Sequence, residues 1–400
     1  MSGPAARRPA SAPHPAAPGS RPGHGTDTEA GEDTGTGTGS RSSRAETGGA
    51  TGADPEADVA ARLEEALTQV RAPDLVLAVS RAGRRTVATG GTADPRLPRT
   101  SLSYELGSLS KTFTVLLLAE LAREGALGLD DRLAAHLPGL ELPHPDSRAI
   151  TLRHLATHTS GLPRVPRDLI PGALLRPYTN GYAGYDRERL LRAFARTRTR
   201  HAPGSHWHYS NLGLALLGPA LEGAVGSDYA TLLTERVLRP LGLARTTIGP
   251  APAGSPAATA AIGHRPDGRT PLPPTDMAAF TSAGAIRATP GDLLRYAEAL
   301  LSPDAPGTPA PLRDALRDVQ VPQLRRGLGH RHTHTLTWYL HPASGGPILF
   351  HAGATFGHQS FLGFHPATAT AVIGTATRHD RTCALINTCY TLLHSLTTPT

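Results

Sequence analysis

The sequence predicts an α/β (α+β) fold in which one sheet, flanked by helices, is interrupted by a large helical insertion. Strand-like runs occur near the start of the folded region, at residues 75–80 and 86–88. Helical periodicity dominates from about residue 109 to 300, and strand-like runs return only after about residue 324. Because strands bury their apolar faces by sharing a sheet, we expect the two groups of strands to pair and the helices to be inserted between them.

Residues 1–56 are predicted to form a disordered, low-complexity tail. No Val, Leu, Ile, Phe, Tyr or Trp precedes Val59, so the segment has no large apolar side chain whose burial offsets the entropy of ordering. We therefore place the folded domain at residues 57–398. A start codon assigned too far upstream is the alternative explanation of the tail.

The elements of the domain follow from apolar spacing. Residues 59–70 predict a first helix, and the two runs that follow predict a hairpin around residues 81–84. Further helices are expected at residues 112–124, 152–158, 186–196, 212–225, 229–239 and 290–301. Later strands are expected at residues 335–341, 348–351, 359–365 and 368–375, followed by a last helix at 382–396.

Composition and charge narrow the classes of partner. The formal net charge of +7 makes nucleic-acid binding a possibility to consider. The arginines are spread along the chain, however, and those at residues 187–200 fit a solvated helix face. No apolar run approaches the roughly 18 residues of a membrane span. Two cysteines are too few for a disulfide framework. Arg7 and Arg8 could begin a twin-arginine export signal, but no apolar stretch follows them. We therefore expect a cytoplasmic protein without nucleic-acid or membrane partners.

Two histidine patterns raise the question of a metal site. His330, His332 and His334 alternate, but no carboxylate or cysteine accompanies them. His154 and His158 stand four apart on a predicted helix, without the Glu that a zinc protease places after the first His. We therefore expect no metal and no cofactor, and we assign the helix pair to packing and hydrogen bonding.

Lys111 is the one lysine among 40 basic residues. A buried ammonium can lose its proton and a guanidinium cannot, so this exception predicts a role in proton transfer. Ser108 lies three residues earlier, a spacing that places both side chains on one face of a helix. The pair predicts an activated serine nucleophile with a proton-accepting amine beside it. The structural alternative is a helix-capping serine and a solvated surface lysine.

A second constellation is Tyr209-Ser210-Asn211, just before the helix expected from residue 212. Side chains two apart in an extended segment point the same way, so Tyr209 and Asn211 can face one cleft. A phenol beside a lysine ammonium could ionise and serve as the general base. The alternative is a helix cap formed by Ser210 or Asn211.

A third constellation, His351-Ala-Gly-Ala354, follows the strand-like residues 347–350. Gly353 is expected to leave room for a substrate backbone to lie against the strand. The N–H of Ala354 would then be available as an oxyanion donor. The alternative is an ordinary edge strand that ends in a glycine turn.

Taken in order, these motifs resemble the three boxes of the serine β-lactamases and D-Ala-D-Ala carboxypeptidases, the penicillin-recognising enzymes. The segments at residues 104–113, 150–163, 240–243, 282–289, 351–357 and 360–364 resemble the class C β-lactamase-like branch. That branch includes carboxypeptidases, esterases and acyltransferases. The resemblance spans about residues 57–398 and implies a β-lactamase-like antiparallel sheet with the helical insertion at about residues 109–300.

The resemblance implies an acyl-enzyme mechanism that needs no cofactor. Ser108 would attack a carbonyl, and Tyr209 and Lys111 would share the proton transfers. The N–H groups of Ser108 and Ala354 would stabilise the oxyanion, where one such donor is worth about 3 kcal/mol. Asn211 would hold Lys111 and the amide of the substrate.

His351 stands where class C β-lactamases carry a lysine. A neutral imidazole holds a substrate carboxylate less well, and the carboxypeptidase and esterase members more often have histidine there. We therefore expect an esterase or transacylase in natural-product metabolism, acting on a small cytoplasmic ester or amide with water, an amine or an alcohol as acceptor. Two alternatives stay open: a D-Ala-D-Ala carboxypeptidase or class C β-lactamase, and a ligand-binding sensor that does not turn over.

Overall fold

The computed structural model describes residues 55–94, 97–171, 179–249, 260–326 and 332–398. The strands of its large sheet are β1 (Leu75–Arg81), β2 (Arg84–Gly90), β6 (Leu324–Arg326), β7 (His332–His334), β8 (Tyr339–Ala343), β9 (Gly346–Ala354), β10 (Gln359–His365) and β11 (Thr370–Ala376). A small sheet is formed by β3 (Tyr104–Glu105), β4 (Thr247–Ile248) and β5 (Ile286–Ala288).

The order of the strands joins segments from both ends of the described chain. The large sheet runs β2-β1-β11-β10-β9-β8-β7-β6, and the small one runs β3-β5-β4. β1 pairs antiparallel with β11, with Leu75 opposite Ala376. Just beyond this ladder, the N–H of Asp74 donates to the hydroxyl of Thr377 at 2.8 Å. The expected α/β fold, with one antiparallel sheet interrupted by helices, is confirmed.

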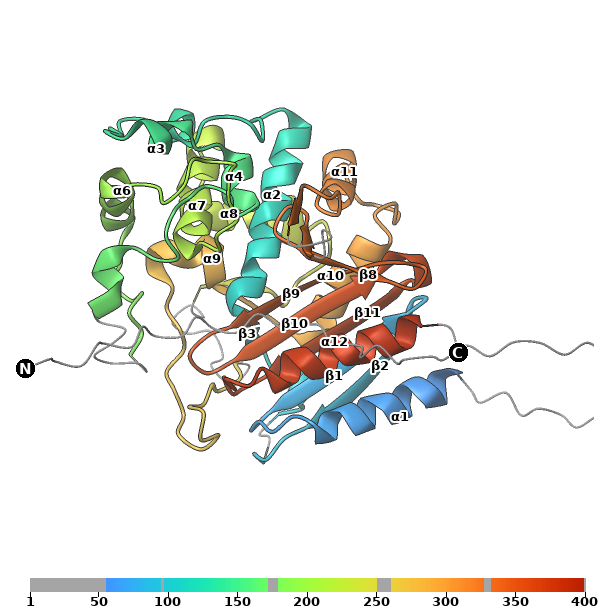
Figure 1. The fold of residues 1–400 in the computed structure, drawn as a ribbon. Coiled ribbons are helices and arrows are strands. Elements are labelled where there is room, and N and C mark those ends of the chain that lie inside the picture. Colours follow the sequence, from blue (N-terminus) through green and yellow to red (C-terminus); the bar gives the residue numbers. More distant parts are fainter. Residues whose placement is uncertain (1–54, 95–96, 172–178, 250–259, 327–331, 399–400) are drawn as a thin grey trace, which may run out of the picture.

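Helices lie on both faces of the large sheet (Figure 1). One face is covered by α1 (Pro55–Thr68) and α12 (Ala384–Thr397), whose apolar side chains form one core with the sheet. The remaining helices gather beyond the other face: α2 (Ser110–Glu124), α3 (Pro145–Ala149), α4 (Leu152–Ala156), α6 (Arg187–Arg196), α7 (Asn211–Val225), α8 (Tyr229–Leu233), α9 (Thr281–Gly284), α10 (Pro290–Leu301) and α11 (Ala310–Asp318). Among the described helices, none combines the length and the apolar character of a membrane span.

The structure departs from the prediction where local signals are weak. α1 begins at Pro55, inside the segment assigned to the tail; residues 1–54 lie outside the described chain. The stretch expected to be helical also holds β4 and β5, and α11 was not predicted. The strand expected at residues 335–341 begins only at Tyr339, as β8, because residues 335–338 connect it to β7 and include Thr337 with a left-handed φ of 71°. The helix expected at residues 229–239 is α8 followed by a π-helical turn.

α2 is the helix that positions the first motif. Its residues from Ser110 to Leu121 are all buried, as befits a helix with apolar side chains on every side. Gly125 caps its C-terminus with a left-handed φ of 84°, which glycine adopts without strain. Because Ser108 precedes α2 directly, the buried helix fixes where the serine lies.

Candidate active site

Ser108 lies in the 3₁₀ turn Gly107–Leu109, and its side chain is partly exposed. Gly107 has a φ of 51° and packs against β9, where a Cβ at this position would stand 2.4 Å from the carbonyl oxygen of Ala354. The hydroxyl of Ser110 accepts the N–H of Ile286 at 3.0 Å, which ties the start of α2 to β5. The chain around the serine is therefore held from two sides.

Lys111 is fully buried behind Ser108. Its Nζ lies 3.1 Å from Ser108 Oγ and donates to the carbonyl oxygen of Ala283 at 2.7 Å. Burial, together with the positive charge of Arg164, lowers the pKa of Lys111 well below its usual value. In its neutral form, the amine at this position can accept the proton of the serine hydroxyl.

Tyr209 approaches the same oxygen from the start of α7. Its phenol donates to Ser108 Oγ at 2.7 Å, and its ring centroid lies 5.2 Å from Lys111 Nζ. Burial raises the pKa of Tyr209 to about 12, although the Ser108 hydrogen bond and the Arg164 charge oppose it. The ionised phenol that the sequence suggested is therefore disfavoured, because the ammonium that was to stabilise it is itself disfavoured by burial.

Neighbouring residues fix the backbone at Tyr209. The hydroxyl of Ser210 caps α7 by accepting the N–H of Gly213 at 2.9 Å, and it donates to the carbonyl of Pro163 at 2.7 Å. The N–H of Ser210 donates to Nδ1 of buried His158 at 3.2 Å, and the His158 ring lies 4.5 Å from the Tyr209 ring. The helix cap and the tyrosine at the nucleophile thus coexist in one motif.

Asn211 lies beside this pair, but its contacts differ from those that the resemblance implied. Its Nδ2 lies 3.5 Å from the hydroxyl of Tyr182, while Lys111 is held by the carbonyl of Ala283. Its Oδ1 is buried and has no hydrogen-bond partner among the described residues. A buried, unpaired amide oxygen near a nucleophile is a suitable acceptor for a substrate N–H.

His351 faces inward from β9 and is only 1% exposed. Its Nδ1 donates to the carbonyl of Ala352 at 2.9 Å, and its Nε2 has no partner within the described chain. Burial, and then the nearby charge of Lys111, lowers the pKa of His351 to about 3. The imidazole is therefore neutral, and it offers no cation to a substrate carboxylate.

The space beside Gly353, where a substrate backbone was expected, is filled by the protein itself. A Cβ on Gly353 would stand 1.9 Å from the carbonyl oxygen of Leu106, so the segment that leads to Ser108 fills this space instead of a substrate backbone. The next residue, Ala354, is exposed, and its backbone lies against Gly107. β9 and the serine turn therefore meet backbone to backbone.

Three residues that take part in this arrangement were not predicted as site residues from the sequence: Ala283, Tyr182 and His158. Ala283 and His158 lie in the segments at residues 282–289 and 150–163 that carried the resemblance, and that was the available signal. Ala283 acts through its backbone carbonyl, which no side-chain pattern reveals. His158 was assigned to packing and hydrogen bonding, and its contacts with Ser210 and Tyr209 are of that kind.

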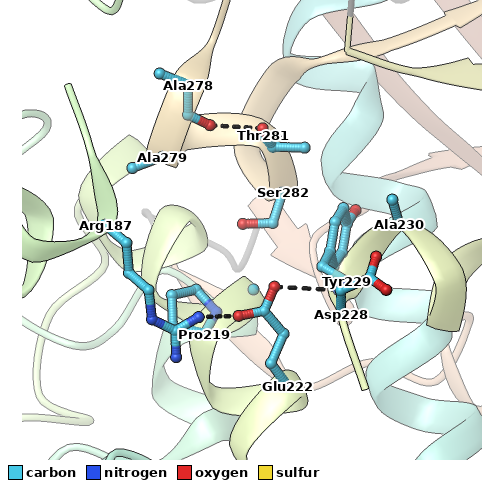
Figure 2. Close-up of a pocket in the computed structure, with 11 residues that line it drawn as sticks. Arg187, Pro219, Glu222, Asp228, Tyr229, Ala230, Ala278, Ala279, Thr281 and Ser282 are labelled. Carbon is cyan, nitrogen blue, oxygen red and sulfur yellow. Dashed lines mark hydrogen bonds and ion pairs between the residues drawn. The ribbon is translucent and has the colours of Figure 1, made fainter. Parts of the chain in front are cut away.

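A separate pocket of about 250 Å³ lies among α6, α7, α8 and α9 (Figure 2). Arg187 and Glu222 form an ion pair across it, and Glu222 also accepts the N–H of Tyr229 at 3.1 Å. Its wall includes Ser282, the neighbour of Ala283, so the pocket borders the helix that holds Lys111. No group of three metal-ligating side chains occurs in the described chain, and His330 lies outside it.

A helix-flanked antiparallel sheet with a buried lysine and a tyrosine on one serine oxygen defines a class of serine acyl-transfer enzymes. A family model described as Beta-lactamase matches residues 59–385. The chain therefore belongs to the Beta-lactamase family.

The curated relatives match part of the chain. The D-alanyl-D-alanine-carboxypeptidase/endopeptidase AmpH of Escherichia coli K12 is 35% identical over 208 residues, which are 52% of this chain and 51% of AmpH. Penicillin-binding protein 4* of Bacillus subtilis 168 is 30% identical over 165 residues, 38% of this chain and 31% of that protein. The chain thus spans about half the length of AmpH and less of the second relative.

Solved structures agree on the fold. A class C β-lactamase from Rhodobacter sphaeroides superposes with a TM-score of 0.71 at 23% identity, covering 85% of this chain and 99% of that one. Another class C β-lactamase superposes with a TM-score of 0.73 at 20% identity, covering 87% and 99%. At such identities the likeness shows the fold alone.

Proposed function

We propose that this protein is an esterase or transacylase that passes an acyl group through an ester on Ser108. The observation that carries the proposal is the meeting of Lys111 Nζ and the Tyr209 hydroxyl at Ser108 Oγ, at 3.1 and 2.7 Å. The donor is a small ester or amide. The neutral state of His351 supports a donor that requires no cation on β9.

In the first half-reaction, Ser108 Oγ attacks the acyl carbon and its proton passes to the neutral amine of Lys111. The bond to the leaving group breaks, and the leaving atom takes this proton through the hydroxyl of Tyr209. Water, an alcohol or an amine then attacks the acyl-enzyme and gives its proton to Lys111. That proton returns to Ser108 Oγ as the ester bond breaks, while the N–H groups of Ser108 and Ala354 support the oxyanion in both steps.

The test is covalent labelling with a slowly hydrolysed activated ester, followed by peptide mass spectrometry. The peptide that contains Ser108 should gain the acyl mass, and Ser108→Ala should lose the adduct. Ser205→Ala, which changes an exposed serine, is the matched control and should label like the wild type. Labelling that persists in Ser108→Ala would exclude this nucleophile.

Product partitioning then separates transfer from hydrolysis. One activated ester is supplied while the concentration of an alcohol or amine acceptor is raised, and both products are measured. A rising share of transfer product identifies a transacylase. If no acceptor competes with water, the enzyme is an esterase. A cytoplasmic location is part of the same proposal and is tested by cell fractionation.

A D-Ala-D-Ala carboxypeptidase is the second candidate, and the AmpH match favours it. If a D-Ala-D-Ala peptide or nitrocefin is cleaved much more efficiently than p-nitrophenyl esters by one preparation, this candidate replaces the esterase. A burst of one equivalent of product without turnover of any ester would indicate a sensor instead.

A further inference from the structure

We propose that Arg164 selects the donor by binding a carboxylate carried on its acyl part. The substrate class is then the monoesters or monoamides of short dicarboxylic acids. This inference rests on the acyl transfer through Ser108 proposed above, and it adds the substrate group that the site recognises.

The ring of Tyr209 lies between the guanidinium of Arg164 and the nucleophile, Ser108. Its Cζ is 5.3 Å from the centroid of Tyr209, and the hydroxyl of that tyrosine donates to Ser108 Oγ at 2.7 Å. Arg164 is exposed, so a ligand bound at Ser108 can reach it from solvent. A guanidinium stacked on an aromatic ring keeps its planar fork of N–H donors available, and that fork matches the two oxygens of a carboxylate.

The charge of Arg164 has no partner inside the described chain. No described carboxylate forms an ion pair with it, and its side chain has no hydrogen bond there. Arg189 provides the contrast, because it stacks on Tyr185 at 4.4 Å and also pairs with Asp168. The stack is similar at both sites, but only the charge of Arg189 is neutralised by the protein.

The other basic groups of the site do not compete with Arg164 for an anion. Lys111 is buried and occupied by Ser108 and Ala283, and burial lowers its pKa. His351 is buried with a pKa of about 3. The permanent, exposed charge beside the nucleophile is therefore that of Arg164.

The backbone at Arg164 sets the side of Ser108 on which the anion would bind. The carbonyl of Arg164 accepts the N–H of Asn211 at 2.8 Å and that of Leu212 at 3.2 Å, so the residue is tied to the first turn of α7. Arg164 therefore lies on the same side of the site as Asn211, whose buried Oδ1 has no hydrogen-bond donor among the described residues. His351 and Ala354 belong to β9 instead. We therefore place the carboxylate of the acyl chain on the α7 side of Ser108, beside the Tyr209 ring.

The test compares two donors that share one leaving group: mono-4-nitrophenyl glutarate, which bears a carboxylate, and its neutral methyl ester. The readout is the ratio of their kcat/KM values, because both donors use Ser108 in the same way. The wild type should prefer the acid, and Arg164→Gln should lower the ratio at least about 10-fold, the effect of losing one charge-assisted pair. Arg164→Lys should fall in between, since it keeps the charge but loses the fork.

Arg189→Gln is the matched control and should leave the ratio unchanged. Added NaCl should lower the ratio for the wild type but not for Arg164→Gln. The proposal is overturned if Arg164→Gln, with wild-type thermal stability, keeps the ratio, or if Arg189→Gln lowers it equally. It is also overturned if the wild type instead prefers a carboxylate on the leaving group, measured with 3-carboxy-4-nitrophenyl butyrate. Failure of the acyl transfer itself would look different, as turnover of both glutarate esters that survives Ser108→Ala.

Discussion

The carbonyl oxygen of Leu106 lies 1.9 Å from the point where a Cβ on Gly353 would stand. The same point is 2.8 Å from the backbone nitrogen of Leu109 and 2.8 Å from the hydroxyl oxygen of Ser360. β9 and the segment that carries the nucleophile thus touch without any intervening side chain. A side chain at this contact would separate the two backbones that flank Ser108.

Gly353→Ala should therefore abolish most activity and destabilise the protein. Overpacking costs about 1–3 kcal/mol, and a shift of about 1 Å at a nucleophile costs on the order of 100-fold in rate. Thermal unfolding and ester hydrolysis measure the two effects. Gly291→Ala is the control, since its Cβ would meet a single atom at 4.0 Å. Similar behaviour of the two variants would refute the close contact.

Glu105→Gln should be among the most destabilising polar substitutions in the domain. The carboxylate accepts Arg287 Nη2 at 2.8 Å and the hydroxyl of Thr275 at 2.7 Å, and both charged side chains are buried. Glutamine leaves the guanidinium buried without a counter-charge, which costs about 3–5 kcal/mol. Urea unfolding measures the loss. Glu188→Gln, which breaks an exposed pair with Arg192 on α6, should cost under about 1 kcal/mol. Equal losses would contradict the prediction.

The rate of hydrolysis of a neutral ester should rise with pH through an apparent pKa below 10.5. Burial and the Arg164 charge lower the pKa of Lys111, and only the deprotonated amine accepts the serine proton, so activity appears as pH rises through that pKa. Lys111→Arg should lose about as much rate as Lys111→Ala, on the order of 10²–10⁴-fold, because guanidinium stays protonated. An unchanged rising limb in Lys111→Arg would assign the proton transfer to Tyr209.

Stability should fall as pH drops from about 6.5 toward 3, partly because of His351. Its pKa is about 3 in the folded protein because of burial and the Lys111 charge, whereas an unfolded histidine has a pKa of about 6.5. Between these values the unfolded chain binds more protons, so the free energy of unfolding decreases as pH falls, by up to about 1.4 kcal/mol per pH unit.

His351→Asn should make this pH dependence shallower, as measured by urea unfolding at pH 7, 6 and 5. Buried His158, whose pKa is also lowered by burial, keeps its contribution in the variant. His206→Gln changes an exposed histidine and serves as the control. A slope for His351→Asn equal to that of the control would contradict the lowered pKa of His351.

The sequence predicted the long elements well because each carries a repeated apolar signal. α2, α7 and α10 lie almost where they were expected, and so do β10 and β11. Strands of two or three residues, such as β4 and β5, contain too few positions to alternate. α11 is only nine residues long and follows a stretch rich in proline, which hid it.

The candidate site shows the same division. Ser108 could be chosen because it stands three residues before the one lysine, Lys111, and Tyr209 could be chosen from its motif with Asn211. The structure brings Ser108, Lys111 and Tyr209 together. Ala283 could not be predicted, because its contribution is a carbonyl that every residue has. Arg164 could not be predicted either, because the sequence contains many arginines and only the structure shows that this one lies over the Tyr209 ring.

During synthesis, β1 leaves the ribosome long before β11 exists to pair with it. The hydrogen bond between Asp74 and Thr377, at the end of this ladder, joins positions 303 apart in sequence. Contacts of such separation form slowly, and until they form β1 exposes an apolar edge that can pair with other chains. The soluble yield of the protein should therefore depend on the supply of holding chaperones and on the rate of synthesis. Slow expression in the cold should rescue more protein than any change within the helical insertion.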